Sequence, residues 1–395
     1  MSQNILKIES ILKDKYLPAL KNQIGTEPSP FLEKVKKTPL TNNKIVGAAP
    51  IGLNGGFGFG YEGTNTPSSG AQQYSKFEIE AKDMYVSIEI SDKTVKLANS
   101  DASSMINALN QEVKSSYETA KWNLGRALFG DGSGKLATVT ANAVASNEVT
   151  VDTTKLLREG LIIDFYATAD AVGATPNVAK RRITAINRAT SKITIDGTAT
   201  AVVAGFITVQ NSYGREICGL GAIMDSTNVT SLYGITKANY PWINPITKDA
   251  SNDLTDIVLS EAIKDSRDYK NGNIDLIMMG DAAHKAYLAY MKENNTVNAD
   301  KLKFLGGTTG MSVLLGDRES VIINERFVPE NEVWGVDTAS FKFESTDWAF
   351  ASKGGEVFNL TNDTSIYRAL LACYGNLMCE NPGGCFKITN CNATA

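Results

Sequence analysis

The stretch Asp101–Gly134, DASSMINALNQEVKSSYETAKWNLGRALFGDGSG, decides the fold. Its apolar side chains recur every three or four residues, which is typical of one face of an α-helix. They are Met105, Ile106, Leu109, Val113, Tyr117, Ala120, Leu124 and Leu128. The pattern predicts a helix over residues 100–129, capped by Ser100 or Asp101 and ended by the glycines from Gly130 to Gly134. At about 1.5 Å per residue this helix is roughly 40 Å long, longer than most globular domains use.

A glycine-rich segment precedes this helix. The apolar run Ile45–Leu53 leads into Asn54–Gly63, NGGFGFGYEG, and the residues beyond alternate between apolar and polar up to Ile90. We therefore predict a hairpin of two long strands over residues 44–90 with a glycine-rich tip. A two-stranded hairpin is barely stable alone in water, so its strands and its aromatic tip need a surface to pack against. The tip aromatics are Phe57, Phe59 and Tyr61.

The first 43 residues are predicted to form an arm. Ile5–Leu20 has apolar side chains at helical spacing, and Gly25, Pro28, Pro30 and Pro39 then deny the segment regular structure. Such an arm has little core of its own and needs a neighbour to lie against.

Residues 136–213 are rich in short β-strands and turn signals. The predicted strands are Val149–Val151, Leu161–Tyr166, Ile183–Ile186, Ile193–Ile195 and Phe206–Val209, with a turn at Asp196-Gly197. This pattern predicts an inserted small β-barrel or sandwich.

From Asp253 onward the pattern is α/β. Helices are predicted at Leu254–Tyr269 and Asp281–Met291, and strands at Ile274–Met279, Met311–Leu315, Val321–Asn324 and Val333–Val336. The section Phe341–Lys387 is predicted to be mainly strands, with a nearly continuous apolar run at Ile366–Tyr374.

The bulk composition is that of a globular protein. The 395 residues are 43% hydrophobic and 21% charged, enough apolar material for two or three domains, and the net charge of −4 offers no global attraction to nucleic acid or an anionic membrane. No signal peptide and no transmembrane stretch is predicted. Five cysteines, an odd number, favour free thiols in a reducing cytoplasm.

Catalytic and cofactor motifs are weak. Gly55, Gly56, Gly58 and Gly60 do not have the G-x-G-x-x-G spacing of a dinucleotide-binding loop, and Gly130–Lys135 is one residue short of a P-loop. The single histidine, His284, has no local catalytic motif. Cys373, Cys379, Cys385 and Cys391 recur every six residues, which does not suit a zinc site. We therefore predict no catalytic residue, no cofactor and no metal, and a chain that is not an enzyme.

The order of parts resembles the major capsid proteins of tailed bacteriophages, whose Hong Kong 97-like fold encapsulins share. The matching stretches are Ile11–Pro18, Gly58–Gly63, Asn123–Gly134, Tyr367–Leu371 and Tyr374–Leu377. The resemblance implies an α+β fold with these parts: an N-terminal arm (1–43), an extended E-loop hairpin (44–90), a peripheral domain with its spine helix (91–135, 214–250 and 340–395), the inserted β-domain (136–213) and an axial domain (251–339).

The resemblance also implies a function. It predicts a major capsid protein that forms hexamers and pentamers of an icosahedral virion shell around double-stranded DNA, without sequence-specific binding to that DNA. The inter-subunit contacts would be the E-loop tip, Gly55, Gly56, Phe57, Gly58, Phe59, Gly60 and Tyr61, and an axial tip loop, Gly306, Gly307, Thr308, Thr309 and Gly310. Implied partners are further copies of the chain, a separate scaffolding protein, a portal protein and a cement or decoration protein on the inserted domain. Assembly would take place in the host bacterial cytoplasm.

Some members of this family cross-link their subunits covalently through a lysine in the E-loop. Residues 54–75 contain no lysine, which predicts a shell without covalent cross-links. Three alternatives stay open: an encapsulin-type compartment, an α/β enzyme with its ligand over the strand at Ile274–Met279, and a secreted β-rich adhesin, which the missing signal peptide disfavours.

Overall fold

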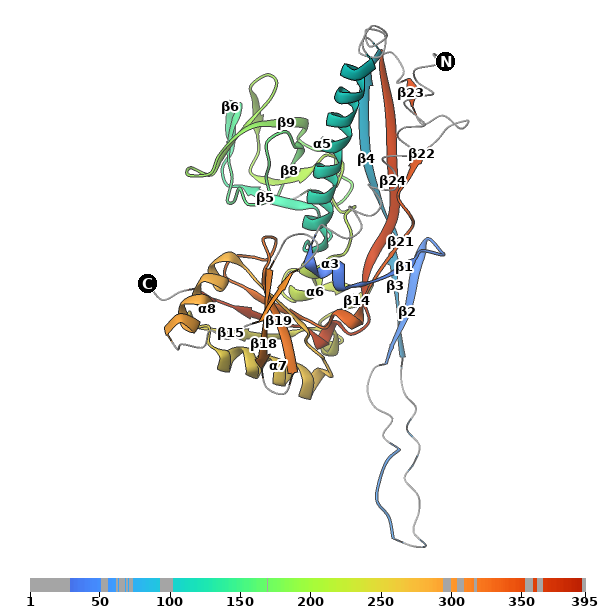
Figure 1. The fold of residues 1–395 in the computed structure, drawn as a ribbon, viewed down its shortest axis with the longest axis vertical. Helices are drawn as coiled ribbons and strands as arrows, with labels where there is room; N and C mark the ends of the chain where they lie inside the picture. Colours follow the sequence, from blue (N-terminus) through green and yellow to red (C-terminus); the bar gives the residue numbers. More distant parts are fainter. Residues whose placement is uncertain are drawn as a thin grey trace. The chain divides into compact units, whose positions relative to one another are not determined.

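The computed structural model describes residues 29–50, 56–61, 63, 68, 70, 74–92, 102–168, 170–293, 300–303, 309–315, 318–351, 358–360 and 365–392 (Figure 1). The predicted helix at Ile5–Leu20 lies outside this part of the chain. The described residues form two compact units. The first lies within Lys82–Ala222 and Trp348–Cys373, and the second within Gly25–Ala81, Ile223–Asp347 and Tyr374–Ala395.

The first unit contains the predicted long helix, α5 (Ala102–Leu128). Val113, Tyr117, Leu124 and Leu128 of its apolar stripe are buried, as the periodicity predicts. The helix contacts β4 (Lys82–Ser91), which pairs with β24 (Ile366–Cys379). The prediction of a long helix is confirmed.

The strand β24 is 14 residues long and continues from the first unit into the second. Within the first unit it pairs with β4, β22 (Ala349–Ala351) and β23 (Asn359–Leu360). Its later residues pair with β21 (Phe341–Ser345) in the second unit. The predicted apolar run at Ile366–Tyr374 is therefore a strand, and it extends to Cys379.

The β-rich region forms a six-stranded sheet in the order β5-β12-β8-β9-β10-β7. The bounds are β5 (Lys135–Val139), β7 (Glu148–Thr150), β8 (Ile162–Ala167), β9 (Val178–Asn187), β10 (Lys192–Ile195) and β12 (Gly205–Val209), with β6 (Ala143–Ser146) and β11 (Thr200–Val202) as a separate pair. A bridge between Val139 and Val151 joins the two ends of the sheet, so it closes into a barrel. The buried members of its core all lie between Leu136 and Ile207. The five predicted strands are confirmed; β5, β6 and β11 were not predicted.

The second unit is built on a seven-stranded sheet in the order β15-β25-β20-β16-β19-β18-β17. The bounds are β15 (Ile246–Asp249), β16 (Leu276–Met279), β17 (Asp300–Lys303), β18 (Thr309–Leu315), β19 (Arg318–Asn324), β20 (Val333–Val336) and β25 (Phe386–Thr389). The helices α7 (Asp256–Lys270) and α8 (Asp281–Glu293) share one core cluster with this sheet. Both predicted helices and all four predicted strands are confirmed. However, two strands of this sheet, β15 and β25, lie outside residues 251–339, the range predicted for the axial domain.

Local sequence explains how α7 begins and ends. The Thr255 hydroxyl accepts a hydrogen bond from the Val258 main-chain N–H and caps the first turn. Asn271 ends the helix in the left-handed conformation, with a φ of +52°. The next strand of the sheet, β16, is buried along its whole length, as its apolar sequence Leu-Ile-Met-Met predicts.

The prediction that prolines deny residues 28–39 regular structure is wrong for the described part, residues 29–39. Ser29 caps a short helix, α3 (Pro30–Lys34), in which Phe31 and Leu32 are fully buried. Proline is compatible with the first position of a helix because its missing N–H has no helical partner there. The strand β1 (Lys36–Pro39) follows and pairs in parallel with β21 as an edge strand, where proline is also tolerated.

The predicted hairpin over residues 44–90 is shorter than expected. β2 (Lys44–Pro50) pairs with β3 (Tyr74–Glu80), but the alternating pattern beyond Ala81 belongs to β4, which pairs with β24. Short elements complete the described chain: α6 (Leu220–Met224), β13 (Ser231–Leu232), β14 (Ile235–Thr236), η2 (Pro241–Ile243), η3 (Thr338–Ser340) and η4 (Pro382–Gly384). No helix in the described part is long and apolar enough to cross a membrane.

Candidate functional site

The hairpin β2–β3 is the candidate site for contacts between subunits. One face of its paired strands is buried against the rest of its unit, and its tip carries exposed aromatic residues. Its register pairs Lys44 with Glu80 and Pro50 with Tyr74. Side chains alternate between two faces, as in any strand. The face with Ile45, Phe77 and Ile79 is buried, whereas the described residues opposite are exposed and mostly charged.

The buried face is held by an aromatic contact. The ring of Phe77 lies 5.7 Å from the ring of Tyr233, which belongs to the turn between β13 and β14. Directly across the hairpin from Phe77 is Gly47. A Cβ at position 47 would lie 2.1 Å from the Phe77 ring, so only glycine leaves room for that ring.

Hydrogen bonds fix the end of the hairpin near β24. The Asn376 side-chain amide donates to the Glu80 carbonyl oxygen at 2.9 Å. The Ala81 main-chain N–H donates to the Asn43 carbonyl oxygen at 3.0 Å. The base of the hairpin is therefore anchored within its own unit by both packing and hydrogen bonds.

The exposed face carries ion pairs between the two strands. Lys44 lies 3.5 Å from Glu78 and 4.0 Å from Glu80, and Lys76 lies 2.6 Å from Glu78. Hydrogen bonding to Lys76, and the positive charges of Lys76 and Lys44, lower the pKa of Glu78. Such exposed pairs add little stability, but the alternating charges keep this face polar.

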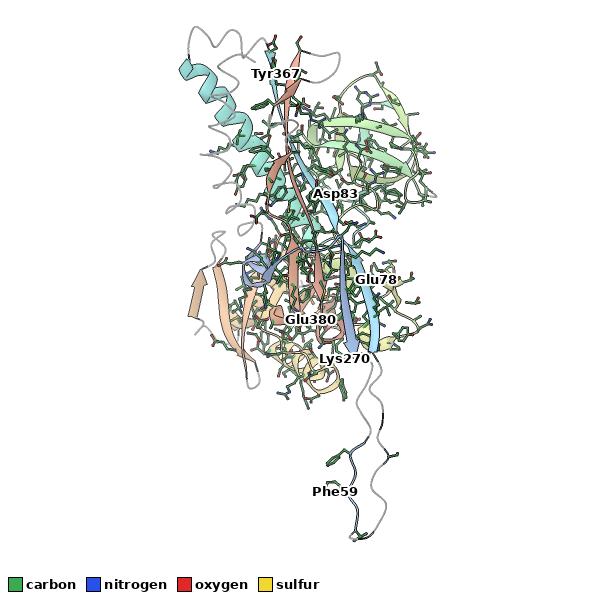
Figure 2. The ribbon with its side chains drawn as sticks, turned by 90° about the vertical axis from the view of Figure 1, so that its right-hand side faces the viewer. Phe59, Glu78, Asp83, Lys270, Tyr367 and Glu380 are labelled. Atoms are coloured by element: carbon green, nitrogen blue, oxygen red, sulfur yellow. The ribbon has the colours of Figure 1, made fainter. Side chains whose placement is uncertain are left out.

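The described tip residues are almost fully exposed. Phe57, Phe59 and Tyr61 are 81%, 95% and 90% exposed, and the Phe57 and Phe59 rings contact each other edge to face at 5.3 Å. Figure 2 shows Phe59 beyond the end of the paired strands that carry Glu78. Clustered exposed aromatic residues are typical of interaction surfaces, because solvent is an unfavourable environment for them.

The predicted site residues fall into three groups. Gly56, Phe57, Gly58, Phe59, Gly60 and Tyr61 belong to the described hairpin. Gly55, Gly306, Gly307 and Thr308 lie outside the described residues. Thr309 and Gly310 lie in β18, paired with Lys303 and Leu302, so these two residues are part of a strand and not of a loop.

The glycine loop that ends α5 closes on itself. The Asp131 carboxylate accepts hydrogen bonds from the main-chain N–H and the hydroxyl of Ser133, at 2.8 and 2.6 Å. The Lys135 ammonium lies over the ring of Phe206, 4.4 Å from its centroid. Neither contact resembles a phosphate cradle, which agrees with the sequence-based assignment of this loop as a helix end.

His284 is a half-buried residue of α8. Burial lowers its pKa, against the opposing effect of Asp281, and no described residue hydrogen-bonds to its Nδ1. A catalytic histidine needs a partner that orients its ring. Among the described residues, the His284 Nδ1 therefore lacks the hydrogen-bond partner that orients the histidine of a catalytic triad.

The cysteines are free thiols, and all but Cys218 are buried. Burial raises the pKa of Cys391 to about 12 and also raises that of Cys379, which keeps both thiols protonated. Among the described residues, no group of three or more His, Cys, Asp or Glu side chains is arranged to hold a metal ion.

Gly47, Tyr233 and Asn376 were not predicted as site residues. A glycine inside a strand signals a close approach of another group, so Gly47 carried a usable signal. Tyr233 and Asn376 reach the hairpin across more than a hundred residues of sequence, and no local pattern marks them.

No protein-family model and no curated protein matches this chain. Solved structures do match it. A chain of the cyanophage A-1(L) capsid asymmetric unit superposes with a TM-score of 0.52 at 11% identity, covering 91% of this chain and 92% of that chain. Gordonia phage Cozz gives a TM-score of 0.43 at 11% identity, covering 94% and 88%. The holo-SrpI encapsulin complex from Synechococcus elongatus PCC 7942 gives 0.47 at 8% identity, covering 93% and 89%.

At these identities the shared property is the fold, and the cyanophage match carries that conclusion. It extends over nearly the whole of both chains. The chain has the α+β fold of phage capsid proteins.

Proposed function

We propose that this chain is the major capsid protein of a tailed phage, a structural subunit and not an enzyme. In this proposal, many copies assemble as hexamers and pentamers into an icosahedral shell around double-stranded DNA. The net charge of −4 suits a container better than a protein that grips nucleic acid tightly.

The observation that carries the proposal is the β2–β3 hairpin. Its base is anchored by Phe77 and Glu80, while Phe57, Phe59 and Tyr61 at its tip are exposed. Aromatic residues bury large areas at protein interfaces, and a neighbouring copy would supply the missing apolar surface. We assign the hairpin the role of the E-loop, with residues 55–61 as the inter-subunit contact.

Other parts of the chain have proposed roles in the same shell. Residues 306–310, the last two of which begin β18, would meet their counterparts near the centre of a hexamer or pentamer. The barrel of β5–β12, with its separate core, would be an inserted domain that displays a surface to a decoration protein. The predicted arm covers residues 1–43, but α3 and β1 are attached within their own unit, so we propose that residues 1–28 lie against a neighbouring subunit.

The proposed partners are further copies of the chain, a separate scaffolding protein and a portal protein, with assembly in the host cytoplasm. Because residues 54–75 contain no lysine, we propose a shell held together without covalent cross-links. A denaturing gel of mature particles should then show a single band at the mass of one subunit. A ladder of covalent multimers would contradict this part of the proposal.

The proposal is tested by expressing the chain alone and together with a candidate scaffolding protein. Sedimentation velocity and negative-stain microscopy should then show rings or closed shells in at least one condition. Nuclease-protected double-stranded DNA in particles from infected cells would support the phage role, whereas a packaged enzyme would favour an encapsulin-type compartment. A stable monomer or dimer in both conditions would contradict the proposal.

A further inference from the structure

Tyr233 has an unusual backbone conformation for an aromatic residue. It forms a two-residue turn with Gly234, between the paired residues Leu232 and Ile235. The φ values of Tyr233 and Gly234 are +54° and +80°, as in a type I′ turn. Asn-Gly is the favoured sequence for such a turn, and a bulky side chain at positive φ is strained. Strain of this kind persists only where the surrounding structure imposes it, and it often marks a functional position.

The side chain of Tyr233 connects the hairpin to β24. Its ring is 8% exposed and lies 5.7 Å from the ring of Phe77 in β3. Its hydroxyl oxygen accepts a hydrogen bond from the main-chain N–H of Cys379, the last residue of β24, at 3.1 Å. Asparagine would suit the turn, but its side chain is too short to make both contacts.

A second contact fixes the hairpin to the same strand. Asn376, three residues before Cys379, donates its side-chain amide hydrogen bond to the carbonyl oxygen of Glu80. Glu80 and Phe77 both lie in β3, so the Tyr233 ring and the Asn376 amide hold that strand at two points. Together with the burial of Ile79, these two contacts restrain the direction of the strand.

The far side of Phe77 is closed by the hairpin itself. Gly47 lies opposite Phe77, and the ring fills the space that a Cβ at position 47 would occupy. Phe77 is therefore confined between Gly47 and Tyr233. A displacement of either neighbour shifts the ring and, with it, the strand pair β2–β3.

We propose that Tyr233 is a positioning residue that sets the direction in which the β2–β3 hairpin leaves its unit. The strained turn places the aromatic ring where Phe77 needs it. This inference rests on the proposed function, since the direction of an inter-subunit hairpin would determine how neighbouring copies meet and how uniform the shell diameter is.

The test compares Tyr233→Asn with Tyr233→Phe in the full-length chain. Tyr233→Asn suits the turn but removes the ring, so main-chain amides of residues 44–49 and 74–80 should exchange with deuterium about tenfold faster in the unassembled subunit. Amides of the barrel, residues 135–209, should exchange as in the wild type. Tyr233→Phe keeps the ring and should keep most of the hairpin's protection.

A general loss of stability would speed hydrogen exchange throughout the subunit, whereas the loss of a positioning residue should speed it only in the hairpin. If Tyr233→Asn speeds exchange in the barrel as much as in the hairpin, or leaves the hairpin unchanged, the inference is wrong. Gly47→Ala is the second variant, because it displaces Phe77 from the other side and leaves the Tyr233 turn intact. Unchanged hairpin exchange in Gly47→Ala would also overturn the inference.

Shell size is the second measurement. Tyr233→Asn should give shells with a broader diameter distribution than wild type or Tyr233→Phe, and equal distributions would count against the inference. If the wild type forms no shells, the proposed function fails, but the exchange experiment on the subunit still decides the role of Tyr233.

Discussion

The Ser29 hydroxyl donates a hydrogen bond of 2.9 Å to the carboxylate of Glu325, and both side chains are buried. The Phe31 main-chain N–H in turn donates to the Ser29 hydroxyl oxygen at 3.2 Å. Phe31 packs edge to face on Phe341, with the ring centroids 5.2 Å apart. These contacts attach α3 to the rest of its unit.

Glu325 makes this attachment dependent on pH. Burial raises its pKa above the ordinary 4.5, although Ser29, Arg326 and the main chain at Phe327 act in the opposite direction. Because the folded pKa exceeds the unfolded one, the folded state binds this proton more tightly. The resulting stability is fully present below about pH 4.5 and is lost as the pH rises through the folded pKa.

Glu325→Gln should remove this dependence, because glutamine keeps a hydrogen-bond acceptor for Ser29 and carries no charge. The free energy of unfolding of the variant, relative to wild type, should increase with pH and reach about 1 kcal/mol in favour of the variant near pH 8. Urea unfolding of both proteins between pH 4 and pH 8 measures the difference. A constant difference across this range would show that Glu325 has the same pKa in both states.

A buried ion pair joins α5 to the segment that follows the barrel. Two nitrogens of the Arg126 guanidinium donate to the two Glu216 carboxylate oxygens, at 2.9 and 2.5 Å, and both side chains are at least nine-tenths buried. Arg126→Met leaves the Glu216 carboxylate buried and unpaired, so it should lower the free energy of unfolding by about 3 kcal/mol.

The matched control is the exposed pair of Lys192 and Glu148, 3.5 Å apart. Lys192→Met should lower the free energy of unfolding by less than about 0.5 kcal/mol, because water solvates an exposed charge. If Arg126→Met and Lys192→Met lower the free energy of unfolding equally in denaturant titrations, the stabilising effect assigned to the buried pair is wrong.

The barrel of β5–β12 should fold without the rest of the chain. The buried residues of its core all lie between Leu136 and Ile207, and its first and last strands pair with each other, so the two ends of the fragment lie close together. A fragment of residues 134–210 should give a β-type circular dichroism spectrum and unfold in one cooperative transition. A fragment that remains unfolded would show that the barrel depends on contacts with α5, such as that between Arg158 and Trp122.

Sequence patterns predicted those helices and strands that are determined by the residues within them. The apolar period of α5 and the continuous apolar run of β16 both follow from the residues within the element. The same reasoning failed at Pro30, because proline ends most regular structure but also suits the first helical position. It failed again at Ala81. The alternation of apolar and polar residues continues there, but β3 ends and β4 begins, and β4 pairs with β24 and not with β2.

The candidate site was predicted only in part. The glycines and aromatic residues of the hairpin tip form a local signal, and the contact role of residues 55–61, which was inferred from it, stays a prediction. The residues that hold the base, Tyr233 and Asn376, act through contacts distant in sequence. Their contacts depend on the tertiary structure, which places β3 beside them, and the periodicity of the sequence does not predict that placement.

The most direct test of the account replaces the exposed tip of the hairpin. The triple variant Phe57→Ser, Phe59→Ser and Tyr61→Ser removes the aromatic side chains without touching the anchored base. Tyr269→Ser is the matched control, since Tyr269 is an aromatic residue of α7 that is 75% exposed. Shell yield is measured for both by sedimentation velocity and electron microscopy. We predict that the triple variant keeps a folded subunit and loses shell formation by about tenfold or more, while the control assembles as the wild type does. Wild-type shell yield from the triple variant would contradict the role of the hairpin tip as an inter-subunit contact.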